Sequence, residues 1–209
     1  MKEEEIRIPT QKRAIAKKEK ILEFGFKLMC SQGYHNTDCI QIAKAADVST
    51  GTVYQYFKDK KDIFYQGLSL YAKDMMFPIT NIEVKKISKD NLKEKIKSLI
   101  NIVIKNHNIS YDAHKEITAM SCTDPEISKT LEKYELEATE TLVKLLEING
   151  ISNSNIYEKA HLIHSWIDNL CHEVVYHKHK KINPEVLIDY VVDAIINLIN
   201  EDQIGKLIK

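Results

Sequence analysis

The chain has 209 residues, of which 44% are hydrophobic and 29% are charged. This length fits one large domain or two modest ones, and six glycines with four prolines are too few for a loop-rich β protein. The formal net charge is zero, but residues 1–60 hold 11 basic against 8 acidic side chains. That mild excess is compatible with an N-terminal part that binds nucleic acid, although it does not establish one.

The composition also bears on the compartment. Met1–Lys20 is polar and charged, so no signal peptide is expected, and no apolar run is long enough to cross a bilayer. The four cysteines form no Cys-x-x-Cys pair, and each lies in a helical pattern, which favours buried, reduced thiols. We therefore expect a soluble cytoplasmic protein without a membrane partner.

The first predicted helix carries apolar residues from Ile21 to Met29 and ends at Gly33, a residue suited to the position after a helix. Four basic residues lead into it: Arg13, Lys17, Lys18 and Lys20. Two interpretations of these residues stay open, a solvated helix start and an arm that touches DNA phosphates.

The stretch Thr37–Lys60 predicts two short helices joined by a tight turn. We expect Thr37 to be the N-cap of the first helix, because its hydroxyl can accept from a free N–H of the first turn. Asp47 lies in the turn, and Ser49 is the expected N-cap of the second helix.

The second of these helices combines buried anchors with small or hydrogen-bonding residues. Val53, Tyr54 and Phe57 follow at helical spacing and are the predicted anchors. The remaining positions suit a helix laid against base edges and phosphates: Thr50, Gly51, Thr52, Gln55 and Tyr56. Asp59 is expected to cap a further helix that starts with Lys60 and Lys61, where N–H groups, helix dipole and ammonium groups favour a phosphate.

The segment resembles the DNA-binding domain of the TetR family of bacterial regulators. The matching residues are Ile21–Glu23, Gly33-Tyr34, Thr37, Ile42–Ala46, Val48-Ser49, Gly51–Tyr54, Tyr56–Lys58, Lys60 and Ile63-Phe64. Two positions depart from the family pattern: Ile40 stands where a basic residue is frequent, and Asp47 stands where glycine is usual. Asp tolerates a left-handed turn better than most residues, so the turn is expected to form while one backbone contact to DNA is lost.

The resemblance implies that the helix Ser49–Phe57 enters the major groove of a palindromic operator in double-stranded DNA. Thr50, Thr52 and Gln55 would face base edges. Phosphates would be held by Thr37, Tyr54, Tyr56 and Lys60. The complete predicted DNA-binding set is Thr37, Ser49, Thr50, Gly51, Thr52, Tyr54, Gln55, Tyr56 and Lys60.

The remaining chain also reads as helices. A helix from Lys60 towards Met76 should stop at Pro78, which places the expected domain boundary between residues 1–78 and 79–209. Later helices are expected to begin at Asp90, near Ala113, at Asp124-Pro125, after Asn155 and at Asn183-Pro184. The sequence thus predicts an all-α fold of about nine helices. A helix-turn-helix domain comes first, and a helical ligand-binding and dimerisation domain follows.

The last two helices carry wide apolar stripes, which one chain of this size has difficulty burying. Pairing them with the same helices of a second subunit solves this in a four-helix bundle about a two-fold axis. The TetR resemblance implies the same homodimer. Ile195 and Leu198 are the residues that we expect between subunits.

The sequence contains no enzyme motif, so an enzyme is not expected. One polar constellation on the penultimate helix has spacing compatible with metal ligation: His161, His164, Asp168 and His172. A polar helix face is the favoured interpretation, since such neighbours are common on solvated helices. No cofactor and no bound metal are therefore predicted.

The resemblance also implies a small-molecule cavity among the C-terminal helices, with a few polar groups in an apolar wall. The predicted ligand contacts are His107, Met120, Tyr134, Trp166 and Asn169. Secondary candidates are His114 and Cys122. A fully packed core without a cavity is the alternative.

Together these features predict a sequence-specific transcriptional regulator, a repressor that a small-molecule effector releases from its operator. The alternative is an architectural or division-control DNA-binding protein of the same fold without an inducer. Effector, operator sequence and the direction of regulation stay open.

Overall fold

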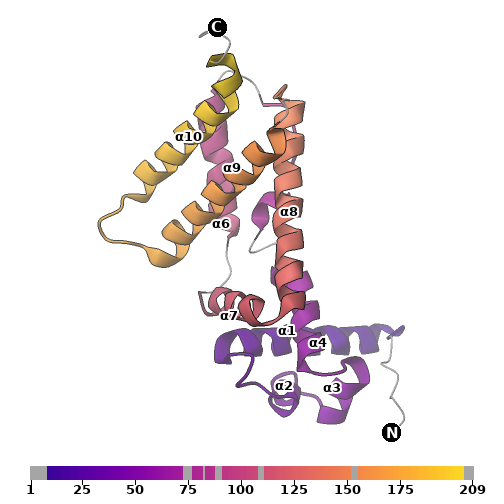
Figure 1. The fold of residues 1–209 in the computed structure, drawn as a ribbon. Coiled ribbons are helices and arrows are strands. Elements are labelled where there is room, and N and C mark those ends of the chain that lie inside the picture. Colours follow the sequence, from indigo (N-terminus) through magenta and orange to yellow (C-terminus); the bar gives the residue numbers. More distant parts are fainter. Residues whose placement is uncertain are drawn as a thin grey trace. The chain divides into compact units, whose positions relative to one another are not determined.

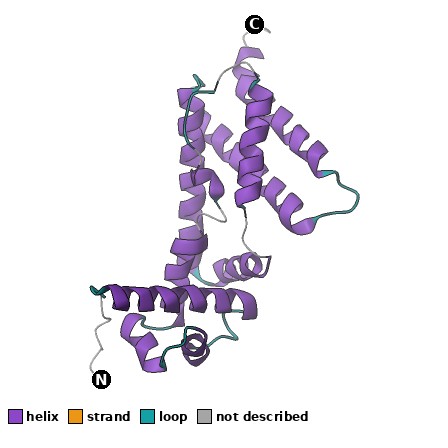
Figure 2. Ribbon diagram, turned by 180° about the vertical axis from the view of Figure 1, so that it is seen from behind, coloured by secondary structure: helices purple, strands orange, loops and turns teal. Residues whose placement is uncertain are grey.

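The computed structural model describes residues 9–72, 77–81, 83–87, 91–107, 111–151 and 155–204. Nine α-helices and no strand occur in these residues, which confirms the predicted all-α class (Figure 1, Figure 2). The helices are α1 Lys12–Gln32, α2 Cys39–Ala45, α3 Thr50–Tyr56, α4 Lys60–Gly67, α6 Leu92–Asn106, α7 Tyr111–Thr123, α8 Pro125–Ile148, α9 Ile156–Cys171 and α10 Pro184–Ile204. Two π-helical segments, Leu68–Ala72 and His172–His177, follow α4 and α9, and Pro78–Asn81 is a 3₁₀-helix. None of the described helices combines the length and the apolar character that a bilayer span requires.

The chain forms two compact units. The first contains Met1–Lys73 and Ile109–Leu131, and the second contains Asp74–Asn108 and Glu132–Lys209. The predicted division after residue 78 differs from these units in two segments: residues 74–78, predicted in the N-terminal part, and Ile109–Leu131, predicted in the C-terminal part. The second segment contains α7, which packs against α1. The expected ends of helices at Met76 and Asp90 lie outside the described residues.

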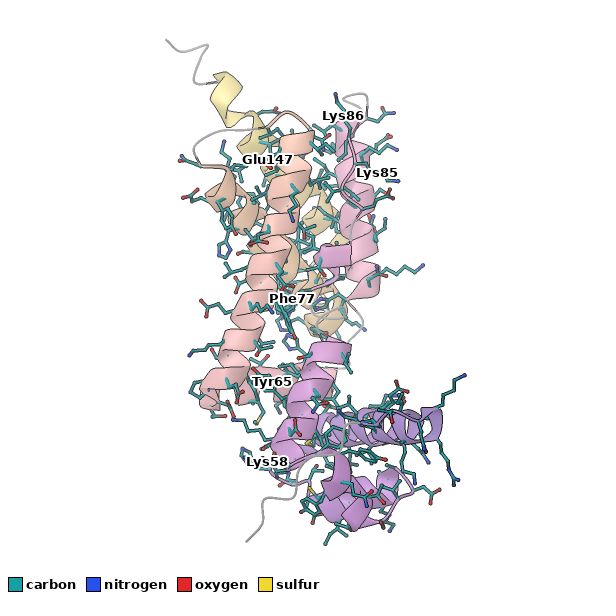
Figure 3. The ribbon with its side chains drawn as sticks, turned by 90° about the vertical axis from the view of Figure 1, so that its right-hand side faces the viewer. Lys58, Tyr65, Phe77, Lys85, Lys86 and Glu147 are labelled. Atoms are coloured by element: carbon teal, nitrogen blue, oxygen red, sulfur yellow. The ribbon has the colours of Figure 1, made fainter. Side chains whose placement is uncertain are left out.

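Long-range polar contacts hold this segment in the first unit. The Glu116 carboxylate on α7 accepts a hydrogen bond of 2.5 Å from the backbone N–H of Tyr34. Lys61 Nζ on α4 lies 2.8 Å from an Asp124 carboxylate oxygen, just before α8. Tyr65 is also on α4 (Figure 3). Its hydroxyl donates to the carbonyl of Glu126 at 3.2 Å. Each contact joins residues more than 60 positions apart, so local sequence patterns do not predict them.

Four of the predicted N-caps are confirmed, and the one predicted for α2 is wrong. Backbone N–H groups of the first turns donate to the side chains of Ser49, Asp59, Asp124 and Asn183. The cap of α2 is not Thr37 but Asp38, whose carboxylate accepts from the Gln41 N–H while the Gln41 side chain accepts from the Asp38 N–H. A glutamine three residues after Asp38 completes this reciprocal capping box, and that signal outweighs the hydroxyl of Thr37.

The turn between α2 and α3 has the left-handed residue that was expected. Asp47 has a φ of +53°, and the short polar side chain makes this conformation accessible to a non-glycine residue. Gly33 after α1 also has a positive φ, as predicted for a residue that ends a helix, and so does Gly150 after α8. The turn therefore forms despite the departure from the usual glycine.

Helices α1 to α4 share one hydrophobic core. Its largest side chains are almost fully buried: Ile21, Met29, Ile42, Val53, Phe57, Ile63 and Phe64. Phe26 and Phe64 lie with ring centroids 5.4 Å apart. Gly67, the last residue of α4, lies so close to Phe26 that a Cβ built on it would come within 2.5 Å of the ring. The absence of a side chain at Gly67 therefore allows α4 to approach α1.

Three of the four cysteines are buried, as the sequence suggested, but Cys122 on α7 is exposed. Burial raises the pKa of the thiols of Cys30 and Cys171 to about 12. The Cys39 thiol is also buried, next to the helix-turn-helix surface.

In the second unit, α10 packs against α6 and α9. The core contains aliphatic side chains from α6, α8, α9 and α10, among them Ile100, Leu142, Ile163 and Val192. Ile195, predicted to lie between subunits, is only 4% exposed in a single chain and belongs to this core. The exposed apolar residues of α9 and α10 are others: Tyr157, Leu162, Val186 and Tyr190.

Gly67→Ala should lower the free energy of unfolding by about 1–3 kcal/mol, because the added methyl overpacks the Phe26 contact. Gly51→Ala is the matched control, since a Cβ there meets nothing closer than 4.0 Å and alanine favours a helix. Thermal unfolding of both variants measures the difference. Equal stability of the two variants would contradict the proposed close approach.

Candidate DNA interface

Helix α3 has an inner and an outer face. Val53, Tyr56 and Phe57 are at most 3% exposed and fix the helix on the core. On the outer face Gly51, Tyr54 and Gln55 are exposed, whereas Thr50 and Thr52 are half-buried. The outer face therefore offers hydroxyl, amide and backbone groups next to a position without a side chain, and such a surface can lie close to a DNA groove.

The predicted roles of the two tyrosines are corrected. Tyr54, expected as an anchor, is 48% exposed, and Tyr56, expected at the phosphates, is 3% exposed. Positions 53, 56 and 57 share one face of a helix, while position 54 lies about 100° away from Val53. The burial of Tyr56 removes it from the predicted DNA-contact set.

The hydroxyl of Tyr54 remains available at the surface. The pKa of Tyr54 is raised, mainly because its hydroxyl forms a hydrogen bond with the Cys39 thiol. The hydroxyl therefore stays protonated at neutral pH, and a protonated hydroxyl can donate a hydrogen bond to a phosphate oxygen.

Ser49 and Thr52 are coupled at the start of α3. The Ser49 hydroxyl accepts from the Thr52 N–H at 3.2 Å, and the two side-chain oxygens lie 2.8 Å apart. This contact fixes the orientation of both hydroxyls, so any contact with DNA would use their remaining hydrogen-bonding capacity.

Lys60 is engaged inside the protein. Its ammonium donates to the carbonyls of Tyr34 and Thr37, both at 2.8 Å, and lies 4.5 Å from the centre of the Tyr34 ring. Thr37 itself is 1% exposed, and its hydroxyl donates to the carbonyl of Gly33. The burial of Thr37 removes it from the DNA-contact set, and Lys60 primarily stabilises the connection between α1 and α2.

Lys61, the other ammonium of the predicted phosphate site, is paired with acidic groups. It lies 2.8 Å from Asp124 and 3.2 Å from Glu126, and hydrogen bonds to these carboxylates raise its pKa. Ile40 on α2 is 67% exposed, so its apolar side chain occupies a surface position. Local sequence patterns do not predict that Lys60 and Lys61 are both engaged, because their partners are backbone carbonyls and distant carboxylates.

Residues 21–66, which include α2 and α3, match the family model described as bacterial regulatory proteins of the TetR family. This N-terminal part of the chain therefore matches the TetR-type DNA-binding domain. The chain is 47% identical over 52 residues to the HTH-type transcriptional regulator HbdR of Aromatoleum sp. (strain CIB), over 25% of this chain and 23% of that protein. It is 32% identical over 101 residues to a fatty acid metabolism regulator protein of Bacillus subtilis (strain 168), over 46% of this chain and 50% of that one.

The matched regions thus span half or less of these TetR-family relatives, which carry the names of regulators rather than enzymes. Solved structures show the same fold over nearly the whole chain. A Mesorhizobium loti MAFF303099 protein assigned to the TetR family has a TM-score of 0.67 at 19% identity, over 90% of this chain and 98% of that one. The fatty acid degradation regulator FadR from Bacillus halodurans has a TM-score of 0.60 at 18% identity, over 90% and 96%.

The predicted ligand residues are divided between the two units. His107 and Tyr134 are buried in the second unit, while Met120 is buried in the first. Trp166 is half-buried and Asn169 is exposed. Of the secondary candidates, His114 is half-buried and Cys122 exposed, both in the first unit.

A cavity of about 80 Å³ does lie in the second unit, with a lining that contains none of these residues. Fifteen of its lining residues are aliphatic: Ile79, Ile87, Leu92, Ile96, Leu99, Ile100, Val103, Leu142, Leu145, Leu146, Ile151, Ile163, Ile167, Ile195 and Ile199. The remaining one, Asn149, directs its amide to the carbonyl of Leu145 and the N–H of Ile87, at 2.7 and 2.6 Å. The described lining therefore presents hydrocarbon to any occupant.

The four-residue constellation on α9 does not form a metal site among the described side chains. His164 is buried, and burial lowers its pKa to about 4, so this imidazole is neutral. His161 Nε2 lies 3.7 Å from Glu135, and His172 Nε2 lies 3.8 Å from Asp168. The favoured interpretation, separate polar contacts on a helix, agrees with this arrangement.

Lys60→Met should lower the free energy of unfolding by about 1.5–3 kcal/mol, because two hydrogen bonds from a charged donor are lost. Lys58→Met is the control, since Lys58 is exposed in the same segment. Chemical denaturation compares the variants. If Lys60 instead acts mainly on DNA phosphates, stability would not change and the salt dependence of DNA binding would weaken by about one charge.

Proposed function

We propose that the chain is a DNA-binding transcriptional regulator that reads its operator with α3. One observation carries this proposal: the inner face of α3 is fixed by three buried side chains, so its outer face presents Gly51, Tyr54 and Gln55 to solvent. A helix held this way can enter the major groove as a rigid unit. The match to the TetR-type DNA-binding domain and the regulator names of the relatives support the same assignment.

Base reading is assigned to Gln55, Thr50 and Thr52. A glutamine amide can make two hydrogen bonds to the edge of an adenine, whereas hydroxyl groups accept several bases. Tyr54 and Ser49 contribute phosphate contacts, which set the register on DNA without reading sequence. Gly51 permits a close approach of the backbone.

We further propose that the protein is a homodimer that represses transcription. A palindromic operator requires two α3 helices related by two-fold symmetry. The exposed apolar residues Leu162, Val186 and Tyr190 on the last two helices supply the dimer surface, in place of the buried Ile195. Burial of these side chains against a second subunit removes apolar surface from water, which stabilises the dimer.

An apolar effector would release the repressor from DNA. The aliphatic cavity in the second unit favours a ligand with an alkyl chain, in line with two similar proteins whose names refer to fatty acid metabolism or degradation. A ligand that binds one conformation better shifts the population to that conformation and lowers operator affinity accordingly. The inducer-free alternative, an architectural DNA-binding protein, would occupy many genomic sites rather than a few promoters.

Gln55→Ala should change the preference among operator variants by about 1–3 kcal/mol at one base position, because a bidentate contact is lost. Gln32→Ala, an exposed glutamine at the end of α1, is the matched control. Binding titrations against a set of single-base operator variants measure the effect. An equal loss of affinity for specific and random DNA would refute base reading by Gln55. Base reading would then be left to Thr50 and Thr52.

Replacing Val186 and Tyr190 with lysine should give folded monomers with weak operator binding, because charges would lie in the apolar dimer surface. Leu136→Lys is the control, an exposed leucine on α8. Sedimentation measures the association state, and circular dichroism measures folding. A double variant that remains dimeric would place the interface elsewhere.

A further inference from the structure

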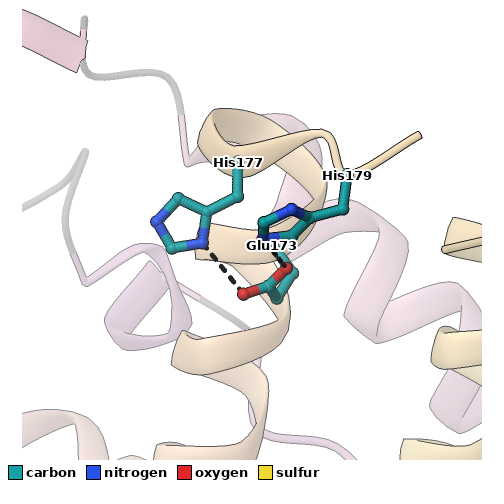
Figure 4. Close-up of side chains that lie close together, drawn as sticks. All are labelled: Glu173, His177 and His179. Carbon is teal, nitrogen blue, oxygen red and sulfur yellow. Dashed lines mark hydrogen bonds and ion pairs between the residues drawn. The ribbon is translucent and has the colours of Figure 1, made fainter. Parts of the chain in front are cut away.

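Three side chains of types that bind metal ions lie close together near the end of the π-helical segment His172–His177: Glu173, His177 and His179 (Figure 4). His177 Nδ1 lies 2.9 Å from Oε1 of Glu173, and His179 Nε2 lies 3.5 Å from Oε2 of the same carboxylate. One donor atom from each of the three residues falls within 4.8 Å of the others. Two imidazoles thus face the two oxygens of one carboxylate.

The backbone builds this arrangement. Lys178 adopts the left-handed conformation, with φ and ψ both +48°, and its N–H donates to the carbonyl of Glu173 at 3.0 Å. A continued helix would turn His179 away from Glu173, since six residues correspond to about 240° of rotation. The left-handed turn instead returns His179 to the carboxylate.

The electrostatics favour a cation. The two oxygens of the Glu173 carboxylate each face one imidazole nitrogen, Nδ1 of His177 and Nε2 of His179. Oε2 of Glu173 is buried and has no hydrogen-bond partner among the described residues. Nε2 of the His179 ring lies 3.5 Å from this oxygen. A carboxylate that two imidazoles face, with one buried oxygen that lacks a hydrogen-bond partner, is suited to a metal ion.

We propose that Glu173, His177 and His179 form a site for a divalent transition metal of the Zn²⁺ class. Ligand atoms around a tetrahedral Zn²⁺ lie about 3.3 Å apart, which follows from Zn–N and Zn–O distances near 2.0–2.1 Å. The observed separations of 2.9 and 3.5 Å lie on either side of that value. To bind the metal, Nδ1 of His177 must carry no proton: a neutral ring carries its proton on Nε2 instead, and a protonated ring releases one proton to solvent.

The site has room for further ligands. A hollow of about 140 Å³ adjoins Glu173 and His179, with Val174, Ile182 and Leu187 in its lining. Water can complete the coordination there. Lys178 also lines the hollow, and its positive charge opposes a cation. We therefore expect an exchangeable metal rather than one bound as tightly as in a site closed by four protein ligands.

Metal binding would connect the π-helical segment to the turn that leads into α10. The ion would hold residues 173 and 179 together and so stabilise the second unit in proportion to its occupancy. This proposal does not depend on DNA binding or on the apolar effector.

The test is Zn²⁺ binding to the tag-free full chain, by calorimetry in two buffers of different ionisation enthalpy. One Zn²⁺ per chain is expected, with release of any protons that the two histidines carry at the pH of the measurement, and with a higher melting temperature when Zn²⁺ is present. His177→Gln and His179→Gln should each weaken binding at least tenfold. His161→Gln, an exposed histidine on α9, should bind as the unchanged chain does.

Both histidines of the site are about half exposed, so these substitutions should leave the fold intact, which far-UV circular dichroism checks. Two results would overturn the proposal. One is the absence of Zn²⁺ binding to the unchanged chain, which would leave the cluster as an ion pair. The other is unaltered binding to the double variant His177→Gln/His179→Gln, which would place the metal elsewhere.

Discussion

The candidate DNA interface depends on the burial of one side of a very short helix. Seven residues are too few for a helix to be stable in water, so α3 exists because Val53, Tyr56 and Phe57 pack into the core of the first unit. The same packing determines which residues point outward. Gly67 and the ammonium of Lys60 act on this arrangement indirectly, since they fix α4 against α1 and α1 against α2.

Much of this unit could be predicted from local signals. Ser49, Asp59 and the left-handed Asp47 are short-range features, and their physical basis is contained within a few residues of sequence. The errors arose where two local signals competed. Thr37 and Asp38 are both good caps, and Tyr54 and Tyr56 are both amphipathic residues within one helical turn, so only the packed structure determines which one is buried.

The C-terminal helices were predicted with equal success, but their sites were not. The predicted ligand contacts are aromatic, sulfur-bearing or polar residues, whereas the observed cavity has an aliphatic lining contributed by four helices and two connecting segments. The Glu173 cluster was missed because the sequence places His177 and His179 in a basic run at a helix end. The π-helical segment has no signature in the sequence. Lysine usually avoids a positive φ, so the left-handed conformation of Lys178 has none either.

The distribution of thiols has a practical consequence for spectroscopy. Cys30, Cys39 and Cys171 are buried, and the high pKa values of Cys30 and Cys171 keep both in the unreactive protonated form. Cys122 alone among the four is exposed. A maleimide fluorophore would therefore attach to α7 without any engineered cysteine, and its emission would report on the first unit of the natural chain.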